Sequence, residues 1–371
     1  MAADAPSRKP LRIALACGGT GGHIFPGLAT ADVLQQRGHH VTLWLAGKDV
    51  ETPAVQGWSG AVITVPAQGL PTGWSPRVVA ALWRLWRARA TCIACMRAAP
   101  PDVLLAMGSY ASVGPVTAAL RLQTPVVLHE ANVLPGRAIR LLARWARAVA
   151  ASFEETRYYL RRRQPVVTGM PIRRELAEAC QRLPRPEPGA PWTLMVLGGS
   201  RGAHQLNMAA TEAVCRLRAQ GVPLRVTHLT GAADEGAVAA AYQEAGVEHV
   251  VHPFTADVAP LYAAAHLALC RSGASTCAEL LAFGVPALLV PYPHATGNHQ
   301  MANAQALVKL GAADVVSERN LTVAWLVDYL ASCFRTPERL TRMSTAARAH
   351  GAANGAAALA DLVERVGWER S

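Results

Sequence analysis

A glycine-rich stretch near the N-terminus holds the residues of this sequence that are best suited to chemistry. Residues 17–27 read Cys-Gly-Gly-Thr-Gly-Gly-His-Ile-Phe-Pro-Gly. Glycine has no Cβ, so a ligand can approach this backbone closely. Free N–H groups at the start of a following helix form a site for phosphate. His23 stands at the mouth of this predicted site, and an imidazole that titrates near neutrality can exchange a proton there.

The segments around this stretch are those that a phosphate loop requires. Residues 11–17 form an apolar run that predicts a buried strand, and residues 26–34 predict a helix with Pro26 in its first turn. The simpler alternative is that the glycines only make a tight turn between strand and helix. Four glycines followed by an exposed histidine favour a ligand site over that alternative.

The same pattern returns 180 residues later. Residues 194–204 again predict a strand, a Gly-Gly-hydroxyl-x-Gly turn and a helix start, with Ser200 in the place of Thr20. Taken alone, the second loop fits a ligand site and a plain turn equally well. Two such loops predict two similar α/β domains that face each other across a cleft.

Neither loop matches the common phosphate-binding motifs. The dinucleotide fingerprint requires a glycine five residues after its first, and counted from Gly19 that position is Ile24. The ATP-binding loop requires Gly-Lys followed by Ser or Thr, which does not follow either glycine run. The sequence therefore predicts a different kind of phosphate ligand.

The composition limits the classes of protein that fit. A length of 371 residues with 51% hydrophobic and 16% charged residues predicts two domains with large cores and excludes a largely disordered chain. A net charge of +11 predicts an anionic partner, and because no nucleic-acid-binding motif accompanies it, we do not expect nucleic acid. Eight scattered cysteines favour reduced thiols in a cytoplasm over a disulfide framework.

An arginine- and tryptophan-rich helix is predicted over residues 77–97. It contains Trp83 and Trp86 among five arginines. Tryptophan and arginine are side chains that suit a membrane surface. A solvated helix face with its tryptophans in the core fits the pattern equally well. No signal peptide and no spanning helix is predicted, since the apolar stretches are short or interrupted by glycine, proline and polar residues.

Polar side chains follow two further strands of the first half. Residues 101–107 predict a strand that ends in a glycine turn before Tyr110, and residues 124–128 predict one that ends at His129, Glu130 and Asn132. Ligand groups in open α/β sheets lie at such ends, so we expect a role in the site. The alternative is that His129 and Glu130 only cap loops.

The second half contains a further stretch with ligand-binding residues. Residues 266–279 predict a strand, a turn and a helix that Ser275 and Thr276 could cap. Glu279 is placed to accept hydrogen bonds from a ribose diol, and its alternative role is to complete a capping box with Thr276. Residues 293–303 form a polar loop whose amides and imidazoles suit a sugar.

Five of these motifs, taken together, resemble one family. Gly18 to His23, His129 to Asn132, Gly198 to Ser200, Arg271 to Glu279, and His299-Gln300 occur in the order seen in the MurG family of N-acetylglucosaminyltransferases. The resemblance covers nearly the whole chain beyond its first ten residues. It implies an α/β protein of the GT-B type, built from two Rossmann-like parallel-sheet domains across a cleft.

The reaction that the resemblance implies is an inverting transfer without metal or cofactor. N-acetylglucosamine moves from UDP-N-acetylglucosamine to the MurNAc 4-hydroxyl of undecaprenyl-pyrophosphoryl-MurNAc-pentapeptide, the step from lipid I to lipid II in peptidoglycan synthesis. The family works at the cytoplasmic face of the inner membrane as a peripheral protein on an anionic lipid surface. Contacts with cell-wall assembly proteins stay open.

The resemblance also implies which residues bind substrates. Glu279 would hold the ribose, Thr255 would lie by the uracil, and Gln300 would read the sugar. Asn132 and Arg173 would complete the donor site from the cleft side, and Thr20, Gly21 and Gly22 would face the acceptor. The diphosphate would meet Ser200 and the helix start formed by Ala274, Ser275, Thr276, Cys277 and Ala278.

The reaction needs a base for the acceptor hydroxyl. His23 is our first choice for the base or its positioning partner, and Glu130 and Tyr110 are the alternatives. The resemblance further implies an acceptor and membrane-side domain over residues 1–168 plus about 344–371, and a UDP-sugar domain over residues 169–343. The final helix is expected over residues 346–366.

The sequence departs from the family pattern at three positions. Ser109 replaces a usual glycine, Ala131 a usual glutamine and Met170 a usual asparagine. Two other functions stay open beside the expected one. A related enzyme of the same fold could glycosylate a different lipid, and a non-catalytic scaffold could bind the UDP-sugar without transfer. The intact glycine loops and Glu279 speak against the scaffold.

Overall fold

The computed structural model describes residues 9–19, 21–50, 53–65, 76–161, 163–186, 192–198, 203–351 and 354–369. The chain folds into two compact units. Unit 1 comprises Met1–Arg173 with Asn354–Ser371, and unit 2 comprises Arg174–Ala353. The predicted pair of parallel α/β sheets is confirmed, one in each unit.

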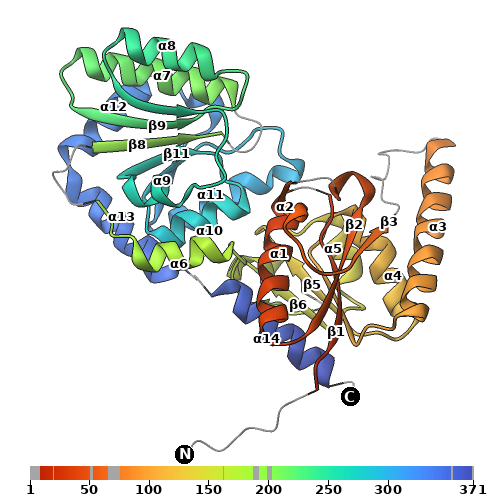
Figure 1. Cartoon of the computed structure of the whole chain (residues 1–371). Helices are drawn as coiled ribbons and strands as arrows, with labels where there is room; N and C mark the ends of the chain where they lie inside the picture. The colour runs from red at the N-terminus through yellow and green to blue at the C-terminus, as the bar shows by residue number, and fades with distance from the viewer. Residues whose placement is uncertain are drawn as a thin grey trace, which may run out of the picture. The chain divides into compact units, whose positions relative to one another are not determined.

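The sheet of unit 1 has seven parallel strands in the order β3-β2-β1-β4-β5-β6-β7 (Figure 1). Ile13 in the central strand pairs with Val41 on one side and Val103 on the other. The chain reverses its direction of travel across the sheet between β1 and β4, which is where open α/β sheets bind ligands. The strands are β1 Arg12–Ala16, β2 His40–Ala46, β3 Val62–Val65, β4 Val103–Ala106, β5 Val126–Glu130, β6 Ala148–Ala151 and β7 Val166–Val167.

Helices cover both faces of this sheet. One face packs against α1 Gly21–Gln36, α2 Pro53–Gln56 and the C-terminal α14 Gly355–Trp368, and α1 and α14 lie side by side there (Figure 1). The other face packs against α3 Pro76–Ala98, α4 Val113–Arg121 and α5 Arg137–Leu142. The 3-10 helices η1 Gly47–Asp49, η2 Tyr110–Ser112 and η3 Glu154–Tyr158 follow β2, β4 and β6.

Unit 2 repeats the design with six parallel strands in the order β10-β9-β8-β11-β12-β13. Here the direction of travel reverses between β8 and β11, so the expected ligand edge lies at the ends of those two strands. The strands are β8 Trp192–Leu197, β9 Leu224–Leu229, β10 Glu248–His252, β11 Leu267–Cys270, β12 Ala287–Leu289 and β13 Ala313–Val315.

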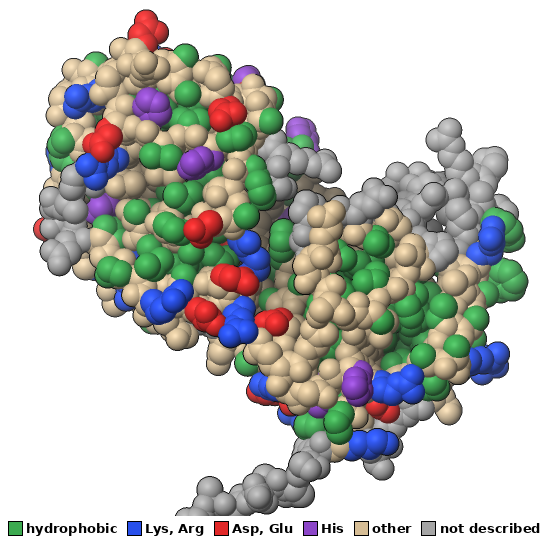
Figure 2. Space-filling model, in the orientation of Figure 1, with side chains coloured by type: hydrophobic (Ala, Val, Ile, Leu, Met, Phe, Trp, Pro, Cys, Tyr) green, Lys and Arg blue, Asp and Glu red, His purple; other side chains and the backbone are tan. Residues whose placement is uncertain are grey.

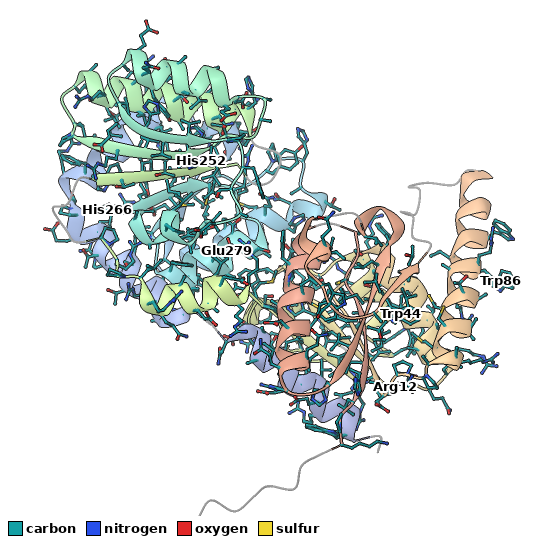
Figure 3. The ribbon with its side chains drawn as sticks, viewed as in Figure 1. Arg12, Trp44, Trp86, His252, His266 and Glu279 are labelled. Atoms are coloured by element: carbon teal, nitrogen blue, oxygen red, sulfur yellow. The ribbon has the colours of Figure 1, made fainter. Side chains whose placement is uncertain are left out.

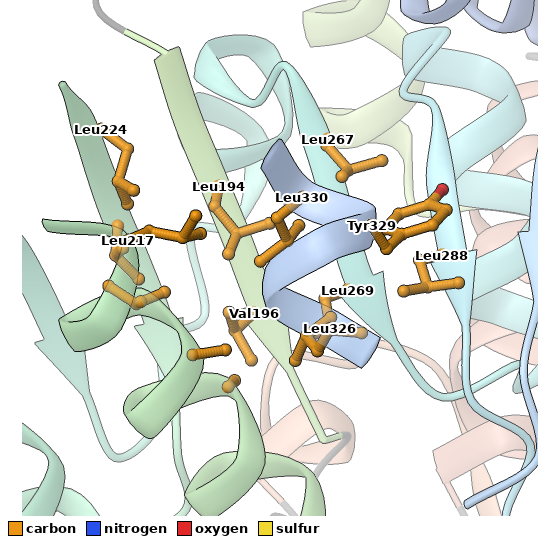
Figure 4. Close-up of a cluster of buried hydrophobic side chains, with 14 of the residues drawn as sticks. Leu194, Val196, Leu217, Leu224, Leu267, Leu269, Leu288, Leu326, Tyr329 and Leu330 are labelled. Carbon is orange, nitrogen blue, oxygen red and sulfur yellow. The ribbon is translucent and has the colours of Figure 1, made fainter. Parts of the chain in front are cut away.

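The core of unit 2 lies between its sheet and the helices of one face. Leu194 and Val196 of β8 pack with Leu326 and Leu330 of α12 and with Leu217 of α7 (Figure 4). Burying such aliphatic side chains stabilises the fold by about 1.5–3 kcal/mol each. The helices are α6 Arg174–Arg182, α7 His204–Ala219, α8 Glu235–Glu244, α9 Ala259–Ala264, α10 Ala274–Phe283, α11 His299–Lys309, α12 Val323–Arg335 and α13 Pro337–His350, with η4 Thr296–Asn298 and η5 Glu318–Asn320.

The predicted helix over residues 346–366 is wrong in its bounds. Residues up to His350 complete α13, and α14 begins only at Gly355. Close packing explains the glycines at this break, because a Cβ on Gly351 would lie 2.5 Å from the Leu281 carbonyl oxygen and one on Gly355 would lie 2.5 Å from that of Met170. An alanine-rich composition predicts a helix but does not reveal such contacts.

All eight cysteines are free thiols. Cys92 and Cys95 lie on α3, where Cys92 is buried in the core between helix and sheet. Among the described residues, no helix is long and apolar enough to span a membrane.

Candidate functional site

The first two glycines of the N-terminal loop are required by the fold of the loop itself. A Cβ on Gly18 would lie 2.8 Å from both the backbone nitrogen of Ala46 and Oδ2 of Asp49. Gly19 has a φ of +118° and donates its N–H to the same Asp49 oxygen at 2.6 Å. Asp49, which no sequence motif indicates, lies in η1 and is buried. Thr20 lies outside the described residues, and Gly21 and Gly22 open α1 at the surface.

His23 lies in the first turn of α1 with its ring nitrogen bound to the backbone. Nδ1 is 2.8 Å from the carbonyl oxygen of Met107, at the end of β4. A carbonyl only accepts, so Nδ1 carries the proton and Nε2 of the neutral ring is an acceptor. Burial lowers the pKa of His23 below its ordinary value, against the opposing effect of the Met107 bond. The ring is therefore neutral at neutral pH, which is the form a general base needs.

The loop after β4 passes over the His23 ring. A Cβ on Gly108 would lie 3.4 Å from Cε1 of His23, and Gly108 itself has a φ of +93°. Tyr110 follows at the start of η2 with 39% of its surface exposed. The loop thus brings the predicted Tyr110 to the same strand ends as His23, with its side chain open to solvent.

Glu130 holds the backbone of the loop after β5. Its Oε1 accepts from the N–H of Asn132 at 2.9 Å, and its Oε2 accepts from the N–H of Gly136 at 2.9 Å. The carboxylate is 4% exposed, and burial raises its pKa against these hydrogen bonds. Asn132 also reaches Oε1 through its side-chain amide at 3.4 Å. This geometry favours a loop-holding role for Glu130 and leaves His23 as the better base.

His129 is a buried side chain of β5 beneath this loop. Its Nε2 lies 3.3 Å from Oγ of Ser152, and burial lowers the pKa of His129 to about 4. The same hydroxyl lies 3.3 Å from Sδ of Met170, one of the three departures from the family pattern. Ala131, another departure, is also buried. Both departures are therefore buried residues.

Arg173 approaches the start of α1. Its guanidinium lies 5.5 Å from the ring centre of Phe25, a side chain that is itself exposed on α1. A cation over an aromatic face is an attractive contact. His23, Tyr110 and Arg173 thus come from three separate segments of unit 1.

Unit 2 has a candidate site of its own at the start of α10. Gly273 is the N-cap, with an extended backbone and no side-chain cap. The N–H groups of Ala274, Ser275 and Thr276 have no carbonyl one turn earlier to bond, so they are donors for an anion. The predicted capping by Ser275 and Thr276 is wrong, because both lie inside the first turn.

Two other predicted residues of α10 contribute differently. Cys277 is fully buried, burial raises the pKa of its thiol to about 12, and its N–H is bonded to the Gly273 carbonyl at 2.9 Å. Ala278 is half-buried on the same helix. The thiol of Cys277 therefore lies in the core and fixes the position of the helix start.

Glu279 is held by a tyrosine. The hydroxyl of Tyr262, on α9, donates to Oε2 of Glu279 at 2.8 Å. Tyr262 is buried and stacks on Phe283 with ring centres 5.3 Å apart. The alternative of a capping box with Thr276 is wrong, since α10 begins at Ala274, before Thr276. Figure 3 shows Glu279 within unit 2.

Gln300, at the start of α11, has an oriented amide. Its Oε1 accepts from the N–H of Tyr292 at 2.8 Å, so its NH₂ group is the donor end. Its backbone carbonyl accepts from the hydroxyl of Ser272 at 2.8 Å. Asn303 donates to the Ser272 carbonyl at 3.2 Å. The loop after β11 and the start of α11 are thereby tied together.

Arg271 braces the loops around this site, a role that the sequence analysis did not predict. Its guanidinium donates to the Val290 carbonyl at 3.1 Å and pairs with Glu318 in η5. Glu318 lies 47 residues further along the chain, so no local pattern could have indicated it. Thr255 follows β10, and its hydroxyl bonds the backbone of Asp257.

Residues 199–202 of the second glycine loop, including Ser200, lie outside the described residues. The helix that follows it, α7, begins at His204, whose Nδ1 lies 2.8 Å from Asp234. Asp234 also accepts from Asn207 at 2.7 Å, and Asn207 accepts from His228 at 3.2 Å. His204 is exposed, whereas Asn207, His228 and Asp234 are buried. These contacts hold α7 in place, and no local sequence pattern indicates them because their residues lie in separate segments.

Among the described residues, His, Cys, Asp and Glu form no group of three or more that could hold a metal ion.

The comparisons with known proteins agree on one family. The glycosyltransferase family 28 N-terminal domain matches residues 13–151, and the C-terminal domain of that family matches residues 193–362. A UDP-N-acetylglucosamine--N-acetylmuramyl-(pentapeptide) pyrophosphoryl-undecaprenol N-acetylglucosamine transferase of Syntrophotalea carbinolica is 38% identical over 92% of this chain and 95% of its own length. The protein with the same description from Hahella chejuensis is 40% identical over 89% and 91%.

Solved structures support the same assignment. MurG of Acinetobacter baumannii has a TM-score of 0.79 and 28% identity, covering 96% of this chain and 100% of that structure. The calicheamicin glycosyltransferase CalG4, at 17% identity, has a TM-score of 0.66 over 97% and 98%, a likeness of fold alone. The two parallel sheets are thus those of the GT-B fold.

Proposed function

This chain belongs to glycosyltransferase family 28 and, within it, to the MurG family, and we propose that it transfers N-acetylglucosamine from UDP-N-acetylglucosamine to undecaprenyl-pyrophosphoryl-MurNAc-pentapeptide. The product is the lipid II of peptidoglycan synthesis. In this proposal unit 2 binds the donor and unit 1 activates the acceptor.

The donor half of the proposal rests on α10 and α11. The diphosphate is bound by the N–H groups of Ala274, Ser275 and Thr276, where the positive end of the helix also stabilises the departing UDP. Glu279, oriented by Tyr262, accepts from the ribose hydroxyls. The NH₂ group of Gln300 donates to the sugar. Thr255 and Ser200 stay predicted contacts of the uracil and the diphosphate.

The acceptor half rests on His23. Nε2 removes the proton from the MurNAc 4-hydroxyl while the oxygen attacks the anomeric carbon of the donor sugar. The bond from that carbon to the UDP oxygen breaks on the opposite side, so the configuration inverts. Tyr110 stands next to the acceptor in this proposal, together with Thr20, Gly21 and Gly22, and Asn132 and Arg173 complete the donor site. The hydrogen bond from His23 Nδ1 to Met107 is the single observation that carries this half.

The test of this function is a transfer assay with labelled UDP-N-acetylglucosamine and a short-chain lipid I analogue, run in EDTA. We expect transfer by the wild-type chain at an undiminished rate in EDTA, since the proposal uses no metal. Binding of the UDP-sugar without transfer would point to another acceptor or to the scaffold. A failure to bind any UDP-sugar would overturn the assignment of unit 2.

The proposal includes a peripheral position on the anionic inner face of the cell membrane. Along α3, Trp83 and Trp86 are 55% and 64% exposed, and Arg87 stacks over the Trp83 ring at 4.8 Å. In Figure 3, Trp86 points away from the sheet, whereas Trp44 on β2 is buried. Figure 2 shows basic and hydrophobic side chains next to one another along this helix. Such a surface suits anionic lipid.

Vesicle binding tests the membrane contact. We expect the double variant Trp83→Ala/Trp86→Ala to lose binding to phosphatidylglycerol vesicles, because each tryptophan side chain buries apolar area in the lipid when the protein binds. Trp325→Ala, at a 38% exposed tryptophan of unit 2, is the matched control and should bind as the wild type does. Equal binding by all three proteins would contradict the contact.

A further inference from the structure

Ser109 has a backbone conformation that side chains rarely adopt. Its φ is +66° and its ψ is 171°, a region that is essentially restricted to glycine. The other two non-glycine residues with positive φ in the described part of the chain are Gln123 and Asn298. Asn298 lies in the ordinary left-handed region, with a ψ of 29°. Position 109 therefore holds a serine although its backbone conformation favours glycine.

The hydroxyl of Ser109 links two loops. Oγ donates to the carbonyl oxygen of Gly18 at 2.5 Å and accepts from the N–H of Ala111 at 3.2 Å. Gly18 belongs to the glycine loop after β1, and Ser109 belongs to the loop after β4. The two residues are 91 positions apart in the chain. A Cβ on Gly19 would lie only 2.9 Å from the same Oγ, so the loops are in close contact here.

The same two loops hold the catalytic histidine. His23 follows the glycine loop, and its Nδ1 is bonded to Met107 in the loop after β4. Gly108 lies against the imidazole ring. Beneath them, the N–H of Met107 donates to the carbonyl of Ala16 at 2.8 Å. The Ser109 hydroxyl is thus a further tie between the segments that set where the His23 ring lies.

We infer that Ser109 is a positioning residue for the transfer reaction. Its hydroxyl fixes the Gly18 carbonyl, and with it the start of α1, relative to the carbonyl that orients His23. A glycine at this position would relieve the backbone strain but would remove the hydrogen bond to the Gly18 carbonyl. The inference rests on the proposed function, because the residue acts through His23.

Two substitutions separate the effect of the Ser109 hydroxyl from the effect of its backbone conformation. Ser109→Ala removes the hydroxyl and keeps the Cβ, so we expect a lower thermal midpoint and a lower kcat. Ser109→Gly removes both, so we expect a midpoint at or above that of the wild type. The kcat of Ser109→Gly should nevertheless fall about tenfold, by the same factor as the kcat of Ser109→Ala. This is the effect expected when one hydrogen bond that positions a catalytic group is lost. The Kd for UDP-N-acetylglucosamine should not change in either variant.

Gln123→Gly is the matched control. Gln123 has a φ of +57° and follows α4, at the end of the sheet opposite to the candidate site. Replacing it also removes a non-glycine residue with positive φ, but away from the site, and we expect an unchanged kcat. If the wild-type chain transfers sugar and Ser109→Gly has the same kcat, the inference is overturned and the proposed function stands. A wild-type chain that transfers no sugar would remove the proposed function and the inference with it.

Discussion

The two sheet edges where the chain reverses direction are built alike but carry different chemistry. In unit 1 the ends of β1 and β4 meet around His23, a ring with a defined proton on Nδ1. In unit 2 the ends of β8 and β11 lie at the start of α10. The groups available there are the N–H groups of the helix start, the carboxylate of Glu279 and the amide of Gln300 on α11. In the proposed function, the edge of unit 1 moves a proton and the edge of unit 2 binds an anion and a sugar. The same supersecondary unit is thus specialised by a few side chains.

The two carboxylates that the sequence analysis singled out show the same contrast. Glu130 accepts from backbone N–H groups with both oxygens and holds a loop. Glu279 is oriented by a side chain, the hydroxyl of Tyr262. Both oxygens of Glu130 are thus occupied by backbone N–H groups, whereas Glu279 accepts from a side chain.

The largest expected effect comes from removing His23, the proposed base of unit 1. His23→Ala should lower kcat by about 10²–10⁴-fold, the range of general-base catalysis. The Kd for UDP-N-acetylglucosamine, measured by calorimetry, should not change. In the wild type, kcat/KM should fall as pH drops through the pKa of His23, which burial places below 6.5, because the protonated ring cannot accept a proton. An equally large loss in donor affinity would contradict the separation of roles.

Removing the carboxylate of unit 2 should have the opposite signature. Glu279→Ala should raise the KM for UDP-N-acetylglucosamine about 10–100-fold, as expected for the loss of hydrogen bonds to a charged group. Tyr262→Phe keeps the carboxylate and loses only its orienting bond, so the increase should be about two- to tenfold. Steady-state kinetics at varied donor concentration measures both. A larger effect of Tyr262→Phe than of Glu279→Ala would contradict the assigned contact.

Acid should destabilise both units through buried histidines. Burial lowers the pKa of His129 in unit 1 and of His228 in unit 2 to about 4 each. The unfolded chain binds these protons near pH 6.5, so the stabilisation is complete above that pH and is lost as pH falls toward 4. At pH 5 the loss is about 2 kcal/mol per histidine.

Urea unfolding at pH 7.5 and pH 5 measures this loss. His129→Asn and His228→Asn should each reduce the difference in unfolding free energy between the two pH values. A double variant with the full wild-type difference would show that other groups cause the acid sensitivity.

Glu130→Gln should affect stability rather than catalysis. An amide in place of the buried carboxylate sets an NH₂ group against a backbone N–H, which costs about 1–3 kcal/mol of unfolding free energy. Glu178→Gln, at an exposed ion pair with Arg174, is the control and should change stability by less than about 0.5 kcal/mol. If Glu130→Gln lowered kcat as much as His23→Ala, Glu130 would be the base instead.

The sequence predicted what depends on neighbours along the chain. The strands follow from apolar runs, and the family motifs extend this to both sheets. The predicted start of α1 is wrong, because the sequence predicts a helix over residues 26–34 with Pro26 in its first turn, whereas α1 begins at Gly21 and Pro26 lies inside it. Glycine is a poor helix former, so Gly21 and Gly22 suggest a turn by residue type although they open the helix.

The predicted N-caps of α10 are wrong. Ser275 and Thr276 suit an N-cap by residue type, but the helix begins at Ala274 and its N-cap is Gly273. Residue type alone does not fix where a helix begins.

The partners that orient the site could not be predicted in this way. Asp49 is 30 residues from Gly19, Tyr262 is 17 from Glu279, and Glu318 is 47 from Arg271. These contacts arise from the packing of distant segments. The departure at position 109 was visible in the sequence, but its left-handed backbone and its bond to Gly18 were not.

The division of labour between the two units is tested most directly by transfer at saturating UDP-N-acetylglucosamine. His23→Ala and Glu279→Ala are compared with the wild type in a single assay with the lipid I analogue. We expect saturation to bring Glu279→Ala to within about tenfold of the wild-type rate, while His23→Ala stays about 10²–10⁴-fold lower. Recovery of His23→Ala at high donor, with Glu279→Ala still inactive, would contradict this division of labour.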